Sequence, residues 1–344
     1  MLPRGGRRLS KRATIQDVAD RAGVSRAAVS KVLRNAYGLS DEMRRRVEAA
    51  MRELSYRPQM AARGLRGSTD TLGVLMSDMR NPFFPDIFDG IVARLKQTKY
   101  QPLLGVRPSA DATERSLIET MLDRNLDGLI MIGPHLERDD LVEIARDVPV
   151  VVIGWHDSGG GFDTVNNDDR AGAAAVVDHL VVAGHRRIGF LGLEESGARE
   201  TNSATVRRES YIQAMACHGL EAAIVDSRWS PDSMRERDLA AEWLARPDRP
   251  TAIFAWTDKV AIAVLAAADQ LGLRVPDDLA VVGYDNSWVA GLLQISLTSV
   301  DQDAVTLGRT ATDLLIDRIN GRRNEQHAVT PPQLVVRRST DPAG

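Results

Sequence analysis

Five side chains of the segment 26–34 have the chemistry to contact double-stranded DNA. Outside an apolar stripe, the predicted helix exposes Arg26, Ala27, Ser30, Lys31 and Arg34. The major groove admits one helix, an arginine can donate two hydrogen bonds to a guanine edge, and an alanine can contact a thymine methyl group. We therefore expect Arg26 and Ala27 to contact bases and the other three to hold phosphates, which positions a protein without reading sequence. Solvated surface charge is the alternative for each of these residues.

Polar and aromatic residues follow several aliphatic runs in the rest of the chain. Parallel sheets bind ligands beyond the carboxyl ends of their strands, and Trp256–Lys259 and Tyr284–Trp288 follow two such runs. Flat indole rings beside aspartate and arginine suit polyols and sugars. We expect Trp229, Trp256 and Trp288 to line a pocket, with core packing as the alternative.

Motifs typical of enzymes are missing from the chain. GxGxxG, GxxxxGK[ST], HExxH and GxSxG do not occur, and the run Gly159–Gly161 is not directly followed by a predicted helix. His179 and His185 flank the predicted end of a helix, where histidines more often cap or pack than bind metal. The single cysteine, Cys217, leaves no cysteine-based metal site. The sequence predicts no enzymatic activity, no cofactor and no bound metal.

Three short helices must position the DNA-contacting side chains. Thr14 can cap a first helix whose apolar residues recur at helical spacing until Gly23. After this turn Ser25 can cap a second helix, and Ser40 can cap a third that ends before Pro58. The pattern predicts a helix-turn-helix braced by a third helix. Thr14, Ser25 and Ser40, at the starts of the three helices, are also expected at the DNA interface.

From Leu72 onward, short aliphatic runs alternate with helical patterns, which predicts a parallel α/β fold. The runs are Leu72–Met76, Pro102–Val106, Gly128–Ile132, Val148–Ile153, Ile188–Leu193, Ala252–Ala255 and Ala280–Val282. All fall far short of the roughly 20 apolar residues that a membrane helix needs. No secretory signal is legible, so we expect a cytoplasmic protein with no membrane contact.

Charge is unevenly distributed along the 344 residues. Residues 1–68 hold 16 basic and 6 acidic side chains, a net charge of +10, whereas the rest of the chain carries −13. A basic segment attached to an acidic body suggests a polyanionic partner for the basic segment alone. The arginine-rich residues 1–12 are expected to form a flexible basic arm, either solvated or in contact with that partner.

The N-terminal segment resembles the DNA-binding head of the LacI/GalR repressor family. The resemblance rests on Thr14–Leu33 and on Val47–Pro58. It implies a homodimer that reads a near-palindromic DNA operator, with Arg26 and Ala27 at the positions that select bases.

Residues 59–68 resemble the hinge helix of the same family. The resemblance implies that this helix orders on DNA and that Leu65 inserts between base steps in the minor groove. Gly64 and Gly67 weaken an isolated helix by up to about 1 kcal/mol each, which is consistent with folding only on DNA. A passive linker is the alternative.

The body resembles the periplasmic-binding-protein-like (type I) effector domain of the family over Leu72–Thr340. The matching motifs are Asp78–Phe84, Asp127–Ile130, Val165–Asp168, Gly184–Phe190, Val275–Asn286 and Leu297–Val300. The resemblance implies two α/β lobes joined by three crossovers, with an effector between the lobes. The expected division is a basic arm at 1–12, a helix-turn-helix domain at 13–58, a hinge at 59–68, and an effector-binding and dimerisation domain at 69–340. Within the last, the N-lobe is expected at about 70–165 and 299–326, and the C-lobe at about 166–296 and 328–340.

By matching position, the resemblance assigns Arg207 to the oxygens of an effector and Asp285 to its hydroxyl groups. Arginine supplies a planar fork of donors and an ionised aspartate supplies acceptors, so the two can orient a hydroxylated ligand. The other expected effector contacts are Phe83 or Phe84, Asn167 or Asp168, Trp229, Trp256, Asp258 and Trp288.

The predicted protein is therefore a transcriptional regulator, most simply a repressor, whose operator affinity is set by a sugar or polyol. Trp256–Asp258 stands where many sugar-binding relatives have an Asn-Asp pair, Asn167-Asp168 reverses the usual order, and Ala304 replaces an aromatic residue. Inducer and co-repressor both remain open as roles of the effector. A binding protein for sugar import and an α/β enzyme are the rival classes, and the basic head and the missing motifs disfavour them.

Overall fold

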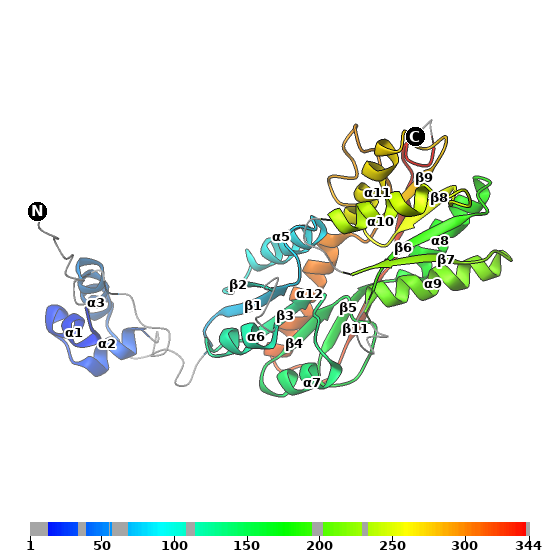
Figure 1. Cartoon of the computed structure of the whole chain (residues 1–344). Helices are drawn as coiled ribbons and strands as arrows, with labels where there is room; N and C mark the ends of the chain where they lie inside the picture. Colours follow the sequence, from blue (N-terminus) through cyan, green and yellow to red (C-terminus); the bar gives the residue numbers. More distant parts are fainter. Residues whose placement is uncertain are drawn as a thin grey trace, which may run out of the picture. The chain divides into compact units, whose positions relative to one another are not determined.

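The structure, a computed structural model, describes residues 13–33, 39–54, 56, 68–107, 114–194, 202–228 and 233–341. The chain divides into two compact units, Met1–Thr69 and Asp70–Gly344 (Figure 1). Each unit is built around its own core.

The first unit contains three helices, α1 (Ile15–Ala22), α2 (Arg26–Leu33) and α3 (Asp41–Glu53). Thr14 and Asp17 form a complete capping box, and Gly23 ends α1 in the left-handed conformation at φ 62°. The buried core consists of Val18, Ala19, Ala22, Val29, Val32, Val47 and Ala50. The helix-turn-helix prediction is confirmed.

The N-lobe of the second unit is a six-stranded parallel sheet in the order β11-β5-β4-β3-β1-β2. Its strands are β1 (Thr71–Met76), β2 (Gln101–Val106), β3 (Gly128–Ile132), β4 (Val150–Ile153), β5 (Asp163–Asn167) and β11 (His327–Thr330). Its helices are α5 (Phe83–Leu95), α6 (Glu114–Leu122), α7 (Arg138–Asp147) and α12 (Ala304–Ile319). The aliphatic strands β1, β3 and β4 are buried in the centre of this sheet.

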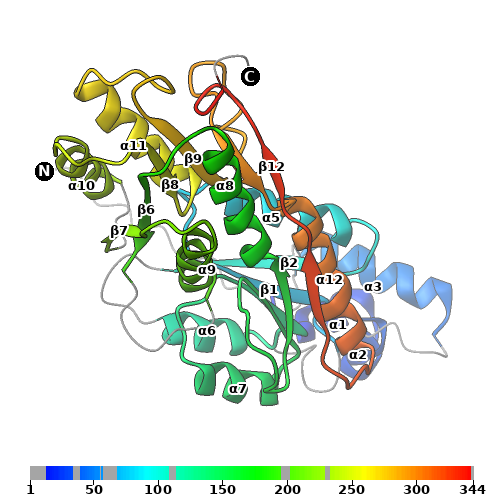
Figure 2. The same ribbon diagram turned by 90° about the vertical axis from the view of Figure 1, so that its right-hand side faces the viewer.

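The C-lobe repeats the same layering with strand order β12-β10-β9-β8-β6-β7, parallel except where β12 meets β10. Its strands are β6 (Ile188–Leu193), β7 (Ala223–Ser227), β8 (Ala252–Ala255), β9 (Ala280–Asp285), β10 (Thr298–Asp301) and β12 (Gln333–Val335). Its helices are α8 (Asp169–Val182), α9 (Ser203–Cys217), α10 (Met234–Leu244) and α11 (Asp258–Gln270). Figure 2 shows the red segment at the end of the chain running from beside α12 in the N-lobe to the C-lobe, where β12 lies.

The chain crosses between the lobes three times, and the crossings fall a few residues from the expected borders. They follow β5, β10 and β11. The expected N-lobe resumed at 299, but Thr298–Asp301 pairs with β9 in the C-lobe. The expected C-lobe resumed at 328, but His327–Thr330 pairs with β5 in the N-lobe. Backbone pairing partners decide these borders, and a single sequence does not reveal them.

Two glycines let α5 and α12 touch backbone to backbone within the N-lobe. A Cβ atom at Gly90 would collide with the carbonyl group of Val305, and one at Gly308 would collide with that of Ile87. Around this contact, Ile87, Ile91 and Leu307 are almost completely buried. The late helix α12 is therefore fixed to the N-lobe by close packing.

In the part of the chain that the structure describes, every helix is too short or too polar to cross a membrane. Among the same residues, no three His, Cys, Asp or Glu side chains converge on a possible metal site. His179 and His185 instead hydrogen-bond to Thr340 and Thr251, each over 2.9 Å.

Candidate functional site

The helix α2 presents polar side chains away from the core of the first unit. Arg26, Ala27 and Lys31 are exposed and Ser30 is half-buried, whereas Val29 and Val32 face inward. Arg34 and Leu65 lie outside the described residues. A helix exposed in this way can enter a major groove with its first turn.

Three further residues expected at the DNA interface are helix caps. Thr14 accepts a hydrogen bond from the backbone N–H of Asp17, Ser25 from that of Ala28, and Ser40 from that of Met43. Each cap satisfies an orphan donor and fixes where its helix begins. These hydroxyls lie at helix N-termini, where partial positive charge favours a phosphate.

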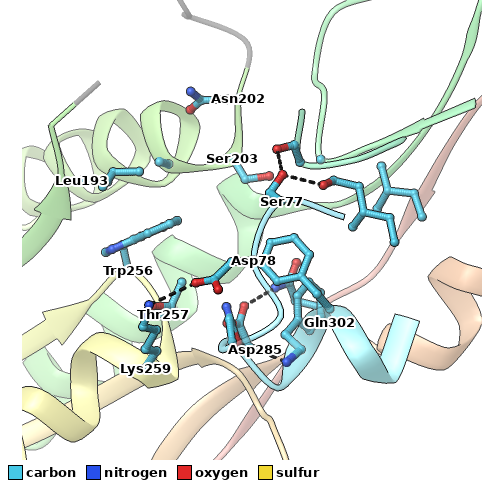
Figure 3. A pocket seen from close by; sticks show the side chains of 18 of the residues that line it. Ser77, Asp78, Leu193, Asn202, Ser203, Trp256, Thr257, Lys259, Asp285 and Gln302 are labelled. Carbon is cyan, nitrogen blue, oxygen red and sulfur yellow. Dashed lines mark hydrogen bonds and ion pairs between the residues drawn. The ribbon is translucent and has the colours of Figure 1, made fainter. Parts of the chain in front are cut away.

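The second unit contains a cavity of about 140 Å³ between its two lobes (Figure 3). Its polar lining includes Ser77, Asp78, Asn81, Arg107, His135, Asn167, Asn202, Ser203, Arg207, Glu236, Thr257, Lys259, Asp285 and Gln302. Its apolar lining includes Phe83, Phe84, Ile87, Ile132, Pro134, Ile153, Leu193, Trp256, Val260 and Leu307. Apolar walls with a few convergent polar groups are typical of sites for small molecules.

Arg207, in the second turn of α9, is the most heavily bonded side chain of the cavity. Its Nε donates to Asp169 over 2.7 Å, Nη1 to the carbonyl of Trp256 over 2.9 Å, and Nη2 to Gln302 over 3.2 Å. The guanidinium carbon lies 3.7 Å from the centre of the Tyr284 ring. The planar group is therefore fixed in place before any ligand arrives.

Asp285 ends strand β9 and faces the same guanidinium. Its carboxylate accepts from Gln302 over 2.7 Å and from Asn81 over 3.1 Å, and Oδ1 lies 3.8 Å from Nη1 of Arg207. Its φ of 115° is a strained backbone conformation of the kind found at functional sites. Burial raises the pKa of Asp285 well above its usual range, although Arg207 opposes this.

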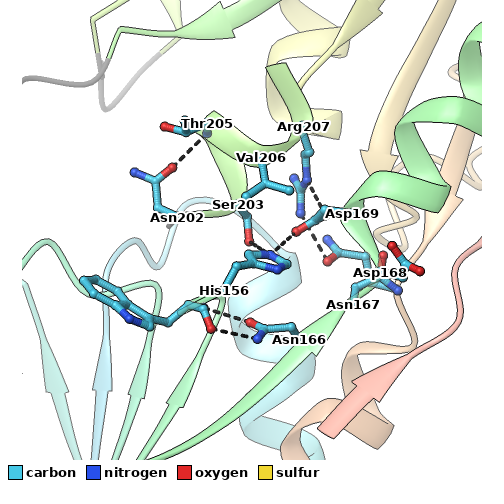
Figure 4. A network of polar contacts seen from close by, with 12 residues as sticks. His156, Asn166, Asn167, Asp168, Asp169, Asn202, Ser203, Thr205, Val206 and Arg207 are labelled. Atoms are coloured by element: carbon cyan, nitrogen blue, oxygen red, sulfur yellow. Dashed lines mark hydrogen bonds and ion pairs between the residues drawn. The ribbon is translucent and has the colours of Figure 1, made fainter. Parts of the chain in front are cut away.

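A polar network behind Arg207 joins His156 to Asp169 and Ser203 (Figure 4). His156, from the loop after β4, contacts Asp169 over 2.8 Å and Ser203 over 3.5 Å, both through Nε2. Burial works to raise the pKa of Asp169, but Arg207 and His156 outweigh it and lower the pKa to about 2. Because one ring nitrogen makes both contacts, the group lacks the serine–histidine–aspartate relay of a hydrolase.

Four of the expected effector contacts line the cavity, in addition to Arg207 and Asp285. They are Phe83, Phe84, Asn167 and Trp256. Trp229 lies outside the described residues. Phe84 and Trp256 are far apart in the chain and are brought together because they follow the carboxyl ends of β1 and β8.

The structure places three expected effector contacts elsewhere. Asp168 caps α8 by accepting from Ala171 over 3.0 Å. Asp258 is buried behind the cavity wall, where it accepts from Ser287 and Ser299. Trp288 is 65% exposed on the surface of the C-lobe. Asp168, the alternative to Asn167, does not line the cavity, and neither do Asp258 and Trp288, because each of these side chains turns away from the opening.

The sequence patterns missed Asp78, Asn81, Lys259 and Gln302. Asp78 and Asn81 lie in the motif Asp78–Phe84, and Lys259 lies in the segment Trp256–Lys259 that follows a strand. The sequence does not show which polar side chains of such segments face inward. Gln302 follows β10, a strand too short and too polar to be predicted. If β10 had been predicted, Gln302 would have been recognised as a residue that follows a strand end.

Comparisons with known proteins match both units. A model described as bacterial regulatory proteins, lacI family, matches residues 14–59, and one described as periplasmic binding protein-like domain matches residues 177–340. The HTH-type transcriptional repressor PurR of Photobacterium profundum is 32% identical over 335 residues, covering 95% of this chain and 98% of the relative.

Solved structures show the same similarity. The lac repressor dimer bound to operator and the anti-inducer ONPF is 27% identical with a TM-score of 0.78, covering 96% of this chain and 99% of that one. A LacI family transcriptional regulator from Enterococcus faecium with bound ribose is 27% identical with a TM-score of 0.70, covering 79% and 99%.

Proposed function

The chain belongs to the lacI family of bacterial regulatory proteins, and from this membership we propose that it acts as a cytoplasmic homodimer whose operator affinity changes when a small hydroxylated effector fills the interlobe cavity. It is a DNA-binding transcriptional repressor and not an enzyme. The identity of the effector, the operator contacts and the dimer are the parts we propose.

The pairing of Arg207 with Asp285 carries the effector proposal. Gln302 bridges the two side chains, so that donors and an acceptor lie side by side in the cavity wall. Two cavity cations already face carboxylates, Arg207 at Asp169 and Lys259 at Asp78. A neutral ligand with hydroxyl groups suits such a site better than an ion, and the Enterococcus relative was solved with bound ribose.

The effector proposal is tested by a thermal-shift screen with sugars, polyols and nucleosides. A ligand that binds only the folded state raises the melting temperature by mass action. We expect a sugar or polyol to stabilise the protein and to change its operator affinity, and Arg207→Lys to abolish both effects. If a base without hydroxyl groups stabilises the protein and no sugar or polyol does, the proposed class of effector is wrong.

We propose that Arg26 and Ala27 read bases, that Ser30, Lys31 and Arg34 hold phosphates, and that Leu65 enters the minor groove. Arg26 supports this proposal because it begins α2 and is exposed. Arg26→Ala should relax base preference at one symmetric pair of operator positions, at a cost of about 1–3 kcal/mol. Selection of binding sites from a random DNA pool measures this base preference. A variant that loses affinity for all DNA sequences equally would show that Arg26 contacts a phosphate instead.

The homodimer proposal draws on an exposed apolar cluster in the segment between β9 and β10. Trp288, Leu292 and Leu293 are all exposed there, Leu293 by 77%. Large exposed apolar side chains in one place mark interaction surfaces. The related lac repressor was solved as a dimer.

A further inference from the structure

The loop between β1 and α5 reaches from the N-lobe to the C-lobe at two points. Asp78 accepts from Nζ of Lys259 in the first turn of α11 over 3.0 Å. Three residues later, Asn81 donates to Oδ2 of Asp285 at the end of β9 over 3.1 Å. We call these four residues the clasp. Figure 3 shows Asp78 and Lys259 facing each other beside Asp285.

Each N-lobe side chain of the clasp is oriented by its own loop. The backbone N–H of Arg80 donates to Oδ1 of Asp78 over 2.8 Å, which leaves Oδ2 directed at Lys259. The N–H of Phe83 donates to Oδ1 of Asn81 over 3.1 Å, so the amide nitrogen of Asn81 must face Asp285. Aspartate and asparagine commonly form such local turns. The orientation of both side chains therefore comes from within the N-lobe.

The clasp contacts are shielded from water. Asp78, Asn81 and Asp285 are each less than 10% exposed, and the Lys259 side chain is 17% exposed. Hydrogen bonds to charged groups gain strength at such sites and are less screened by salt than those on a surface. Separating the lobes would break both contacts at once.

We propose that Asp78 and Asn81 are positioning residues that hold the two lobes together in the effector-free protein. An effector then enters a cavity whose walls already stand in place, and its apparent affinity depends on the fraction of molecules that the clasp keeps closed. The statement that an effector fills the cavity rests on the proposed function. The statement that the clasp holds the two lobes together does not depend on it.

Distance measurement by electron spin resonance between two labels tests the proposal without any ligand. The labels are attached at Asp123→Cys, after α6 in the N-lobe, and at Glu242→Cys on α10 in the C-lobe, both exposed, in a background where exposed Cys217 is changed to Ser. We expect one short, narrow distance distribution for the otherwise unchanged protein. Asp78→Asn and Asn81→Ala should each lengthen and broaden it, and the double variant should do so most.

Asp313→Asn is the matched control, because it removes a hydrogen-bonded ion pair with Arg94 that lies within the N-lobe. Its distance distribution should equal that of the parent. Lys259→Met breaks the Asp78 contact from the C-lobe side and should reproduce the Asp78→Asn distribution, which separates loss of the contact from local misfolding. An unchanged distribution in the double variant, or a parent as broad as the double variant, would overturn the proposal. Since no ligand is present, neither result bears on the class of effector.

Discussion

The pKa values of two carboxylates beside Arg207 shift in opposite directions. Asp169 makes a 2.7 Å contact with Nε and also contacts His156, and its pKa falls to about 2. Asp285 lies 3.8 Å from the same guanidinium, and burial raises its pKa well above the usual range. The close contact with Arg207 and the added contact with His156 lower the pKa of Asp169, whereas burial and the neighbouring charge of Asp258 raise that of Asp285. Asp169 anchors the arginine, whereas Asp285 is the carboxylate that we propose for contact with an effector.

The low pKa of Asp169 predicts a specific loss of stability in acid. Its folded-state pKa of about 2 lies below the 3.8 of an exposed aspartate. The stabilisation is therefore fully present above about pH 4 and is lost as the pH falls through 2. At ~1.4 kcal/mol per tenfold change, it amounts to roughly 2 kcal/mol. All five tryptophans lie in the second unit, so their fluorescence during urea unfolding reports on that unit.

Asp169→Asn should remove this component of the pH dependence. Its free energy of unfolding should be lower than that of the parent at pH 6, because Arg207 loses its charged partner. Between pH 5 and pH 2 it should fall by roughly 2 kcal/mol less than that of the parent. Parallel curves for the two proteins would show that Asp169 is not the titrating group.

At the scale of elements, direct backbone contact holds α5 against α12. Any side chain at Gly90 or Gly308 would force the two helices apart. The residues packed around the contact belong to segments more than 200 positions apart in the chain, such as Ile87 and Leu307. Helices that approach so closely gain dispersion contacts along their whole length.

Gly308→Ala should therefore destabilise the N-lobe even though alanine favours a helix more than glycine does. Overpacking of this kind costs about 1–3 kcal/mol. Arg309→Ala, on the exposed face of the same helix, should change the free energy of unfolding by less than about 0.5 kcal/mol. Urea unfolding measures both variants. If Gly308→Ala raises the free energy of unfolding, α12 can move away from α5 without losing stability, and the close contact is not required.

Local signals explain which elements and site residues the sequence could predict. The caps at Thr14 and Ser40 and the helical spacing between them sufficed for the first unit. Aliphatic runs revealed the central strands of both sheets. β5 was missed because Asp163 and its neighbours are polar although buried, and the short edge strand β12 makes few contacts.

Predictions for the cavity followed the same division. Trp256, which directly follows a recognised strand, was correctly expected to line the cavity. The direction of a loop was not predictable, so Trp288 was placed in the cavity although it is exposed. Partners from distant segments, such as His156 with Asp169, depend on the meeting of the lobes, which no local pattern encodes.

At the scale of the whole molecule, the first unit carries a net charge of +10 and the second a net charge of −13. The operator that we propose is symmetric, so two copies of the chain would read it. The exposed cluster of Trp288, Leu292 and Leu293 is the surface that we propose for pairing. A two-fold axis places the same cluster of both copies face to face, so each substitution acts twice.

Leu293→Asp combined with Trp288→Ser should weaken the dimer. Each buried apolar side chain contributes about 1.5–3 kcal/mol, and ~1.4 kcal/mol corresponds to a tenfold change in Kd. We expect the dimer Kd to rise more than about tenfold, as measured by sedimentation equilibrium. Val182→Asp, at the most exposed apolar position described on the C-lobe, is the control and should leave Kd unchanged. An equal effect of all variants would locate the dimer contact elsewhere.

The three crossings between the lobes have a consequence for synthesis on the ribosome. β11 pairs beside β5 and β12 beside β10, so neither sheet is complete until the residues near 335 have been translated. Among the described residues, the core of the three helices of the first unit is formed within residues 15–56. A nascent chain can thus fold the part that recognises DNA well before it possesses the part that senses a ligand, and the two lobes become complete within a few residues of each other, at β11 and β12.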